Sequence, residues 1–513
     1  MAKNIIICSD GTGNSTIKAR GTNVFKLFEA VDLHNTQEQV AIYDDGVGTN
    51  SIKFLRLLGG ALGFGLAFNV RQLYIALIRV YKPGDKIYLF GFSRGAFTVR
   101  FLAGLINTVG IIDINHKDID SDAELKARAY QAFREYHHEN RATLEYVYGP
   151  IMNMFNYILG VVFTHFYWAK GAEVFRNKYS VKYAKEENPI HFIGVWDTVS
   201  AVGLPFRDLS GWLNKFVYHF TFSNYRLNPF IKNAYHALAI DDQRKTFHPF
   251  LWDKSAIENE NEDEKQALEK QNMEQVWFSG VHANVGGGYP KQGLSLVALN
   301  WMIRKAESCG LVFVDEDKKQ FFSHQNVNDK LYDSRSGINF IYRYAPRDID
   351  QQCRKYNIPV LIHASVFNRI LRGTEGYAPG NIPAEFELID STEEQCQWTD
   401  VSQNMKAELN GQTTILNRVN NLLLARKWLN MFFILTLLYL VYRTLPDDIC
   451  QKGFTGVVGF FLSDGFTNGM ISQHWSIYAV LALSFILSIT AKRNMQRRFS
   501  EFWYNLIRKY KIN

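Results

Sequence analysis

Cysteine is sparse in this chain and shows no pattern. Five cysteines are scattered over 513 residues, odd in number and without a C-x-x-C pair. A disulfide framework needs paired cysteines, and a structural zinc site needs clustered ones. The sequence therefore argues against both and fits a reducing compartment.

Net charge is also small outside the last residues. The formal net charge is +7, and residues 492–513 carry seven Lys/Arg against one Glu, so this tail supplies almost all of it. The remainder is nearly neutral, which argues against a general nucleic-acid-binding surface. No signal peptide is expected, because "MAKNIIICSDGTG" has one lysine and a four-residue apolar run typical of a first strand.

What the chain does contain is an alternation of short apolar runs and helical patterns. Runs rich in β-branched or aromatic residues predict buried strands over 4–10, 40–46, 86–92, 191–197 and 275–281. Amphipathic patterns predict helices over 69–81, 96–109, 122–146 and 294–308. This alternation is typical of an α/β fold with a doubly wound parallel sheet. The acidic run 258–270 is expected to be a solvated loop or helix face.

Ser93 lies between two glycines in "YLFGFSRGAFTVRFLAGL", residues 88–105, after a strand pattern and before a helix pattern. G-x-S-x-G in this context is typical of a nucleophile elbow, a strained turn that exposes a serine hydroxyl at the carboxyl end of a strand. The alternative is a tight turn that simply joins a buried strand to a helix. Ser93 is therefore a candidate nucleophile.

A serine nucleophile needs a base, and the base needs an orienting carboxylate. In α/β hydrolases these follow the serine in the order Asp or Glu, then His. "GVWDTVSAVGLP" ends a buried run in Asp197, and "FSGVHANVGGGYP" ends one in His282 beside three glycines. We expect Asp197 and His282 to complete a triad with Ser93.

Four other residues compete for these two roles. His363 follows the apolar run in "VLIHASVFNR", and His236 lies in "YHALAIDDQR". Asp241 and Asp242, in that second stretch, compete with Asp197. The glycine-rich turn beside His282 favours it over the other two histidines, and we favour Asp197 over Asp241 and Asp242.

Four motifs together carry a family resemblance: "KNIIICSDGTGNS", "GFSRGAF", "GVWDTV" and "HANVGGGY". In this order and spacing, residues 3–375 resemble the catalytic domain of the type VI secretion phospholipase effectors, part of a wider family of uncharacterised α/β hydrolases. The resemblance implies a Ser/Asp/His hydrolase acting on lipid esters, with Ser93, Asp197 and His282 in the matching positions. Asn284 departs from the Asp that family members often have, and we expect it to make the same Asx-turn hydrogen bonds.

The oxyanion hole is expected beside the elbow. The backbone N–H of Arg94 should be one donor, and Gly11 or Thr12 in the loop "SDGTGNS" should be the other. The glycines could instead make a plain turn, with Asp10 or Asn14 capping the next helix. "DGTG" also fits phosphatase loops in which an aspartate attacks phosphate or binds magnesium.

The chain changes character beyond residue 427. Residues 428–442 and 475–491 carry no charge, and with flanking residues they predict two transmembrane helices at about 428–446 and 472–491. A buried helical pair in a soluble domain is the alternative. Two earlier apolar stretches, 54–70 and 151–168, are not expected to span, and the second is expected to form part of an apolar helical cap or lid.

The predicted organisation has four parts. These are an α/β-hydrolase catalytic domain at 1–395 with insertion or cap segments at 113–190 and 206–235, a linker helix at 396–427, a membrane helical hairpin at 428–491, and a basic amphipathic tail at 492–513.

The distribution of charge predicts a topology. Basic residues flank the two spans and three aspartates lie in the loop 447–474, so the hydrolase domain and C-terminus are expected to be cytoplasmic. An aromatic stripe recurs at helical spacing in the tail, which predicts a helix lying on the anionic leaflet. Docking of that stripe onto the hydrolase is the alternative. The stripe consists of Phe499, Phe502, Trp503, Leu506 and Tyr510.

These features together predict a membrane-associated serine esterase that acts on glycerophospholipids, with no metal or organic cofactor. The expected partners are a phospholipid membrane and a regulatory or immunity protein, with no nucleic acid. Two other functions stay open. One is a membrane-inserting or channel-forming effector with a regulatory hydrolase-like domain, and the other is an anchored esterase or thioesterase for small substrates.

Overall fold

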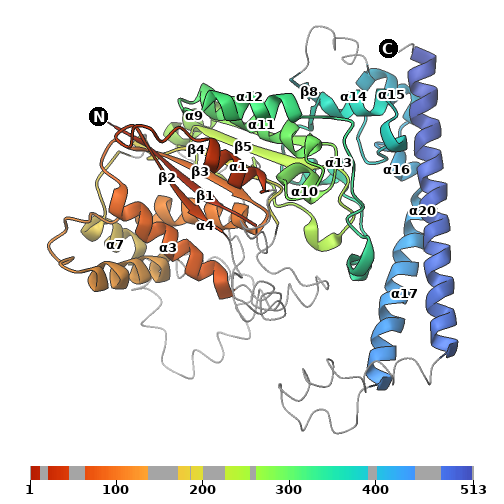
Figure 1. Cartoon of the computed structure of the whole chain (residues 1–513), viewed down its shortest axis with the longest axis horizontal. Helices are drawn as coiled ribbons and strands as arrows, with labels where there is room; N and C mark the ends of the chain where they lie inside the picture. Colours follow the sequence, from red (N-terminus) through yellow and green to blue (C-terminus); the bar gives the residue numbers. More distant parts are fainter. Residues whose placement is uncertain are drawn as a thin grey trace.

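The computed structural model describes residues 2–11, 21–45, 64–136, 171–184, 187–199, 226–254, 262–390, 401–444 and 475–510. Within them, an α/β body carries two long helices along one side, and these helices extend past the body (Figure 1).

The body is built on an eight-stranded sheet whose neighbouring strands are all parallel. The α/β class expected from the sequence is therefore confirmed. In chain order the strands are β1 (Asn4–Ser9), β2 (Gln39–Asp44), β3 (Lys86–Phe92), β4 (Ile190–Trp196), β5 (Asn233–Ala239), β6 (Asn272–Phe278), β7 (Leu361–His363) and β8 (Glu387–Ile389).

The strand order is β2-β1-β3-β4-β5-β6-β7-β8, so the direction of winding reverses at β1. In open α/β sheets a crevice forms outside the carboxyl ends of the strands at such a reversal, and ligands bind there. The loop after β1 and the turn after β3 flank this crevice. The topology therefore brings Ser9, at the end of β1, and Ser93, 84 positions later in the chain, to one edge of the sheet.

Helices cover both faces of the sheet (Figure 1). Alternate residues of β1 and β3 face opposite layers: Ile5 and Ile87 belong to the core beneath one set of helices, and Ile6 and Tyr88 to the core beneath the other. The first set is α3 (Phe64–Val80), α4 (Arg94–Val109) and α7 (Gly171–Tyr179), and the second is α1 (Asn23–Ala30) and α11 (Gly293–Ser308).

Further helices border this body: α9 (Glu262–Glu269), α10 (His282–Gly286), α12 (Asp315–His324), α13 (Ile349–Lys355) and α14 (Ser365–Leu371). No residue of α9 is buried, which agrees with the solvated face expected for the acidic run.

The expected insertion or cap segments are described only in part. Residues 122–136 are helical, and Leu125 and Ala129 are buried in the same core cluster as Phe175 of α7. The ring of Phe133 in this helix stacks on that of Phe101 in α4, and Arg176 of α7 donates to the Asn107 carbonyl oxygen of α4, so both helices pack against α4. The second segment, 206–235, runs into β5 at residue 233, while residues 137–170 and 200–225 lie outside the described residues.

The segment expected as one linker helix also differs. Residues 401–427 form α15 (Val401–Leu409), α16 (Ile415–Arg418) and the start of α17 (Asn420–Thr444). Val401, Leu409 and Ile415 are buried in a core cluster that includes residues of α14. These short helices therefore belong to the body.

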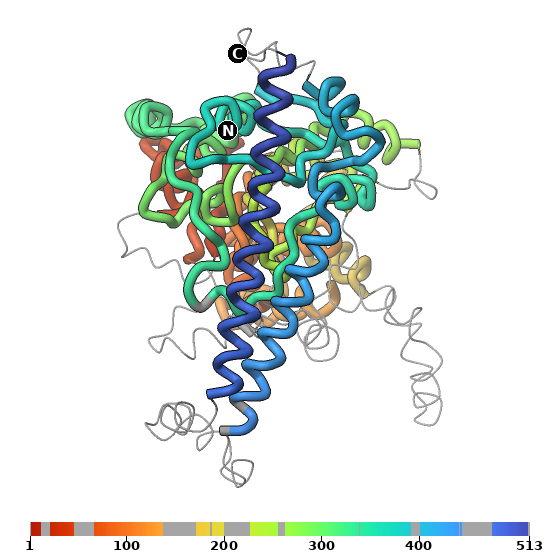
Figure 2. Tube along the Cα trace, turned by 90° about the vertical axis from the view of Figure 1, so that its right-hand side faces the viewer, coloured from red at the N-terminus to blue at the C-terminus, as the bar shows by residue number. Residues whose placement is uncertain are grey.

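Helices α17 and α20 (Trp475–Tyr510) lie side by side (Figures 1 and 2). Both are long and apolar enough to be candidate membrane spans, over Asn420–Leu440 and Trp475–Tyr510. Large apolar side chains on the two helices are exposed, among them Trp428, Leu435, Tyr442, Trp475, Leu483 and Ile486. Such a surface is typical of helices that face lipid or a partner protein.

The predicted amphipathic tail is not a separate element. Residues 475–510 form one helix, and Phe499, Phe502, Trp503 and Leu506 are buried in the core cluster that includes α14. The indole N–H of Trp503 donates to the Pro379 carbonyl oxygen at 2.8 Å. The expectation that this stripe lies on a membrane leaflet is wrong, because the stripe packs against the body.

Candidate active site

Ser93 sits in a strained turn between β3 and α4. Its backbone has φ 59° and ψ −120°, a region that residues with a side chain rarely adopt. A Cβ on Gly91 would lie 2.6 Å from the Ala96 Cα, and a Cβ on Gly95 would lie 2.0 Å from the Ser9 carbonyl oxygen. Both flanking glycines are therefore required by close backbone approach, as in a nucleophile elbow.

The structure brings Ser93, His282 and Asp197 together in one chain of hydrogen bonds. The distance from Ser93 Oγ to His282 Nε2 is 2.8 Å, and the distance from His282 Nδ1 to Asp197 Oδ2 is 2.5 Å. Both contacts are satisfied when the ring proton is on Nδ1, which donates to Asp197, while Nε2 accepts from the serine hydroxyl. All three side chains are buried or nearly so.

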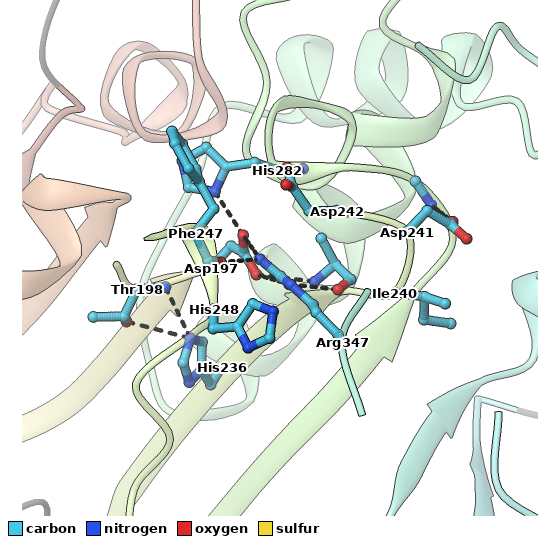
Figure 3. A network of polar contacts seen from close by, with 12 residues as sticks. Asp197, Thr198, His236, Ile240, Asp241, Asp242, Phe247, His248, His282 and Arg347 are labelled. Atoms are coloured by element: carbon cyan, nitrogen blue, oxygen red, sulfur yellow. Dashed lines mark hydrogen bonds and ion pairs between the residues drawn. The ribbon is translucent and has the colours of Figure 1, made fainter. Parts of the chain in front are cut away.

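Asp197 is held by a buried arginine that the sequence analysis missed. Arg347 Nη1 lies 2.6 Å from Asp197 Oδ1, Arg347 Nη2 lies 2.8 Å from Oδ2, and the Ala239 N–H donates to Oδ1 at 3.1 Å (Figure 3). Burial would raise the pKa of Asp197, but the Arg347 charge and hydrogen bonds from Arg347 and His282 hold it well below its usual range. Asp197 is therefore an anion over the physiological pH range.

Arg347 itself is fully buried and also donates to the carbonyl oxygens of Ala239 and Phe247. It lies just before α13 in "RYAPRDID", a stretch without a motif. No local pattern indicates that it would meet a carboxylate 150 positions earlier.

His282 begins α10 and lies between two aromatic rings. The centroids of Phe92 and Phe247 are 4.6 Å and 5.1 Å from its ring centroid. Burial lowers the pKa of His282, and the hydrogen bond and charge of Asp197 oppose that shift only in part. The imidazole is therefore neutral at pH 7 and can accept a proton.

Asn284 has a defined role in shaping the loop that carries His282. Its Oδ1 accepts from the N–H groups of Val281 and Tyr332 at 3.4 and 3.2 Å, and its Nδ2 donates to the Lys330 carbonyl oxygen at 3.1 Å. An aspartate could make the first two contacts but could not donate to Lys330. The departure from the family pattern is thus accommodated by an additional hydrogen bond.

The competing aspartates have other partners. Asp242 pairs with Arg244, whose Nη2 lies 2.7 Å from Asp242 Oδ2, and it also accepts from the backbone N–H of His282 at 3.3 Å. Asp241 accepts from the Gly280 N–H and from the Tyr377 hydroxyl, and burial raises its pKa to about 6. Both shape the loop around His282.

The competing histidines also have other partners. His236 accepts from the Thr198 N–H at 3.2 Å, and burial lowers its pKa to about 3 (Figure 3). His363 stacks on Phe278 at 4.6 Å and contacts the Ser365 hydroxyl at 2.8 Å. These contacts are typical of histidines that support the core.

The expected donors of the oxyanion hole lie in different surroundings. Arg94 is the first residue of the 16-residue helix α4, so its backbone N–H is at a positive helix end. The Gly11 N–H donates to Asp10 Oδ1 at 2.6 Å, which competes with a role in the oxyanion hole. Thr12 lies outside the described residues.

Asp10 is surrounded by donors of the protein. Its Oδ2 accepts from the hydroxyls of Thr22 and Tyr43 at 2.6 and 2.8 Å. Among the described residues there is no group of three His, Cys, Asp or Glu that could hold a metal ion. The neighbours of Asp10 give no support to the phosphatase alternative for "DGTG".

Comparison with known proteins identifies the family. Residues 3–305 match the family described as "T6SS, Phospholipase effector Tle1-like, catalytic domain". The chain is also 30% identical over 215 residues to the uncharacterized protein YEL023C of Saccharomyces cerevisiae, a match that covers 39% of this chain and 27% of that protein. Because the family match spans more than half of the chain, the protein belongs to the Tle1-like phospholipase effector family by its catalytic domain.

Proposed function

We propose that this protein is a membrane-associated serine hydrolase that cleaves acyl esters of glycerophospholipids. The observation that carries the proposal is the chain of hydrogen bonds from Ser93 through His282 to Asp197, at a strained elbow at the carboxyl edge of the sheet. Membership in a phospholipase effector family supports the lipid ester as substrate.

In the proposed reaction, Ser93 Oγ attacks the acyl carbonyl carbon while His282 Nε2 takes the hydroxyl proton. The C=O pair moves onto oxygen, and Asp197 stabilises the imidazolium. The tetrahedral intermediate collapses as the ester C–O bond breaks, and His282 gives its proton to the leaving alcohol. A water then gives a proton to His282 and attacks the acyl carbonyl carbon. The bond from that carbon to Ser93 Oγ breaks, His282 returns the proton to Ser93 Oγ, and the fatty acid leaves.

The backbone N–H of Arg94 is the proposed donor to the developing oxyanion. It follows the nucleophile directly and lies at the start of α4, where the helix dipole favours negative charge. Because Gly11 donates to Asp10 in this structure, a contribution from Gly11 requires that hydrogen bond to open. Thr12 is the other candidate for the second donor.

The proposed location follows from the two apolar helices. With α17 and α20 in the bilayer, the body lies at one membrane surface, and the basic residues at their ends favour the cytoplasmic side for the hydrolase and the C-terminus. A regulatory or immunity protein that restrains the hydrolase is a further expected partner, in keeping with the effector family.

The test is hydrolysis of phospholipid vesicles by the purified full-length chain and its Ser93→Ala variant. Ser323→Ala is a matched control, because Ser323 lies in the exposed last turn of α12. We expect fatty-acid release to vanish in Ser93→Ala and to persist in the control. Equal release from all three proteins would overturn the proposal. Membrane permeabilisation that persists in Ser93→Ala would favour a membrane-inserting effector instead.

A further inference from the structure

A cavity of about 560 Å³ lies where the two long helices meet the body. Its walls come from the segment around η4 (Gly337–Ile341), from the start of α17 and from the middle of α20. Figure 2 shows these two helices running together along the body before they extend past it. We call this the junction cavity.

One wall of the junction cavity is apolar. The ring of Phe340 lies 4.8 Å from that of Phe433 on α17 and 5.0 Å from that of Phe485 on α20, measured between centroids. Ile489 extends this wall along α20. Phe485 is itself 40% exposed and lies on α20, one of the two candidate membrane spans.

The rest of the described lining is rich in basic groups. Arg335 and Arg426 both line the cavity with only 5% of each residue exposed, and the Nε of each has no hydrogen-bond partner among the described residues. Lys492 and Arg493 add two further basic groups, while Asp333 is the carboxylate in the described lining. Positive charge therefore exceeds negative charge in the described lining, and two of the basic residues are buried.

The partners of these groups leave most of that charge uncompensated. Asp333 pairs with Lys492 at 2.7 Å. Arg335 donates to the Phe340 carbonyl oxygen at 3.0 Å, and Arg426 stacks on Tyr344 at 3.8 Å from the ring centroid. Burial, together with the nearby Arg426 charge, lowers the pKa of Arg335 to about 10. Burying two guanidinium groups in one cavity without a carboxylate for each costs free energy unless an anion joins them.

We propose that the junction cavity binds the phosphate-bearing headgroup of an anionic phospholipid. Guanidinium groups match phosphate oxygens in shape and charge, and the acyl chains would lie along the aromatic wall toward the bilayer. The site rests on the proposed membrane location of α17 and α20. It is separate from Ser93 and would seat a lipid that is bound rather than cleaved.

The junction cavity also adjoins the region around the catalytic histidine. It shares Arg426, Lys492 and Asp333 with a neighbouring cavity of about 340 Å³ that reaches Asp242 and Val281. Val281 precedes His282, and Asp242 accepts a hydrogen bond from the backbone N–H of His282. A headgroup in the junction cavity would therefore restrict the motion of α17 and α20 relative to the loop that carries His282.

The test measures thermal unfolding of the full-length chain in detergent while lipid is added. All variants carry Ser93→Ala, so that no lipid is consumed and the result does not depend on hydrolysis. Phosphatidylglycerol is the anionic probe, phosphatidylcholine is the zwitterionic probe, and inorganic phosphate is the free-phosphate probe. We expect only phosphatidylglycerol to raise the unfolding midpoint at micromolar concentrations.

The basic part of the lining is tested by the double variant Arg335→Gln/Arg426→Gln. The concentration of phosphatidylglycerol at half-effect should rise at least tenfold. Arg497→Gln/Arg508→Gln removes two exposed charges from α20 outside the cavity and should leave this concentration unchanged. Arg335→Lys keeps the charge but not the guanidinium shape. Its phosphatidylglycerol concentration at half-effect should lie between those of the two double variants.

Two results would overturn the proposal. One is an equal response of the cavity variant and the exposed-charge control, which would place the effect on general surface charge. The other is full stabilisation by inorganic phosphate alone, which would make the ligand a free phosphate. If the cavity variant does not fold, Arg335→Lys and Lys492→Gln carry the same comparison.

Discussion

Replacing Arg347 with methionine should uncouple Asp197 from the charge that keeps it ionised. The two Arg347–Asp197 contacts measure 2.6 and 2.8 Å, and both residues are fully buried. At a charge separation of ~4 Å and an effective dielectric constant of ~20, their attraction is about 4 kcal/mol, or roughly a thousandfold in the ionisation equilibrium of Asp197.

The loss of this attraction should appear first in the pH dependence of kcat/KM. Since burial by itself raises the pKa of Asp197, the variant should bind a proton on Asp197 at a higher pH than the wild type does. A protonated Asp197 no longer stabilises the His282 imidazolium, so kcat should fall about tenfold to a hundredfold at pH 7. KM should change little, because Arg347 is not proposed to touch substrate.

The assay is a profile of kcat/KM against pH with a water-soluble ester, together with denaturant unfolding. Removing one partner of a buried pair costs ~3–5 kcal/mol, so the variant should also be less stable. Arg369→Met is the matched control, because Arg369 is equally buried and donates to the backbone carbonyls of Val327 and Asp329. It should lose stability and keep the wild-type pH profile.

An Arg347→Met variant that loses stability like the control while its acidic limb stays at the wild-type pH would refute a role of Arg347 in the ionisation of Asp197. Arg347 would then be a structural residue. If the acidic limb shifts in Arg347→Met and returns toward the wild-type pH in Arg347→Lys, the positive charge at this position keeps Asp197 ionised.

The remaining predictions are simpler. Because burial lowers the pKa of His282, activity should persist below pH 6.5 and disappear as pH falls through that lowered pKa; a kcat/KM limb above pH 6.5 would contradict this. Asn284→Asp loses its donor to a backbone carbonyl and should cost about 1–3 kcal/mol in denaturant unfolding, with Ser93-dependent hydrolysis retained. Trp503→Ala should cost ~3–5 kcal/mol and expose α20 to proteolysis, and unchanged protease resistance would count against docking of this helix on the body. For topology, a membrane-impermeant thiol reagent applied to intact cells should label a cysteine at position 464 and not one at position 504, and the reverse pattern would invert the orientation.

Features that depend on local pattern were predictable from the sequence. Five strands follow from apolar runs rich in β-branched or aromatic residues, and the elbow follows from two glycines around Ser93 between a strand and a helix. Asp197 and His282 were selected because both come directly after buried runs, and the carboxyl ends of parallel strands meet at one edge.

Strands with weak local signals were missed. β5 reads Asn-Ala-Tyr-His-Ala-Leu-Ala, with three alanines and no β-branched residue, and β7 and β8 have three residues each. These segments are strands because neighbours on the sheet supply hydrogen bonds and cover them. Pairing with neighbouring strands therefore determines the secondary structure of these segments, which strand propensity alone does not predict.

The sequence by itself determined that the last helix carries an aromatic stripe and that Asp197 follows a buried run. It did not determine which surface covers the stripe or which residue pairs with Asp197. An aromatic stripe such as Phe499 and Trp503 loses the same contact with water whether it meets lipid or protein, so local pattern cannot distinguish the two. Arg347 reaches Asp197 across 150 positions of chain. Only the tertiary structure decided both contacts, because each depends on which distant surfaces the completed sheet brings within a few ångströms.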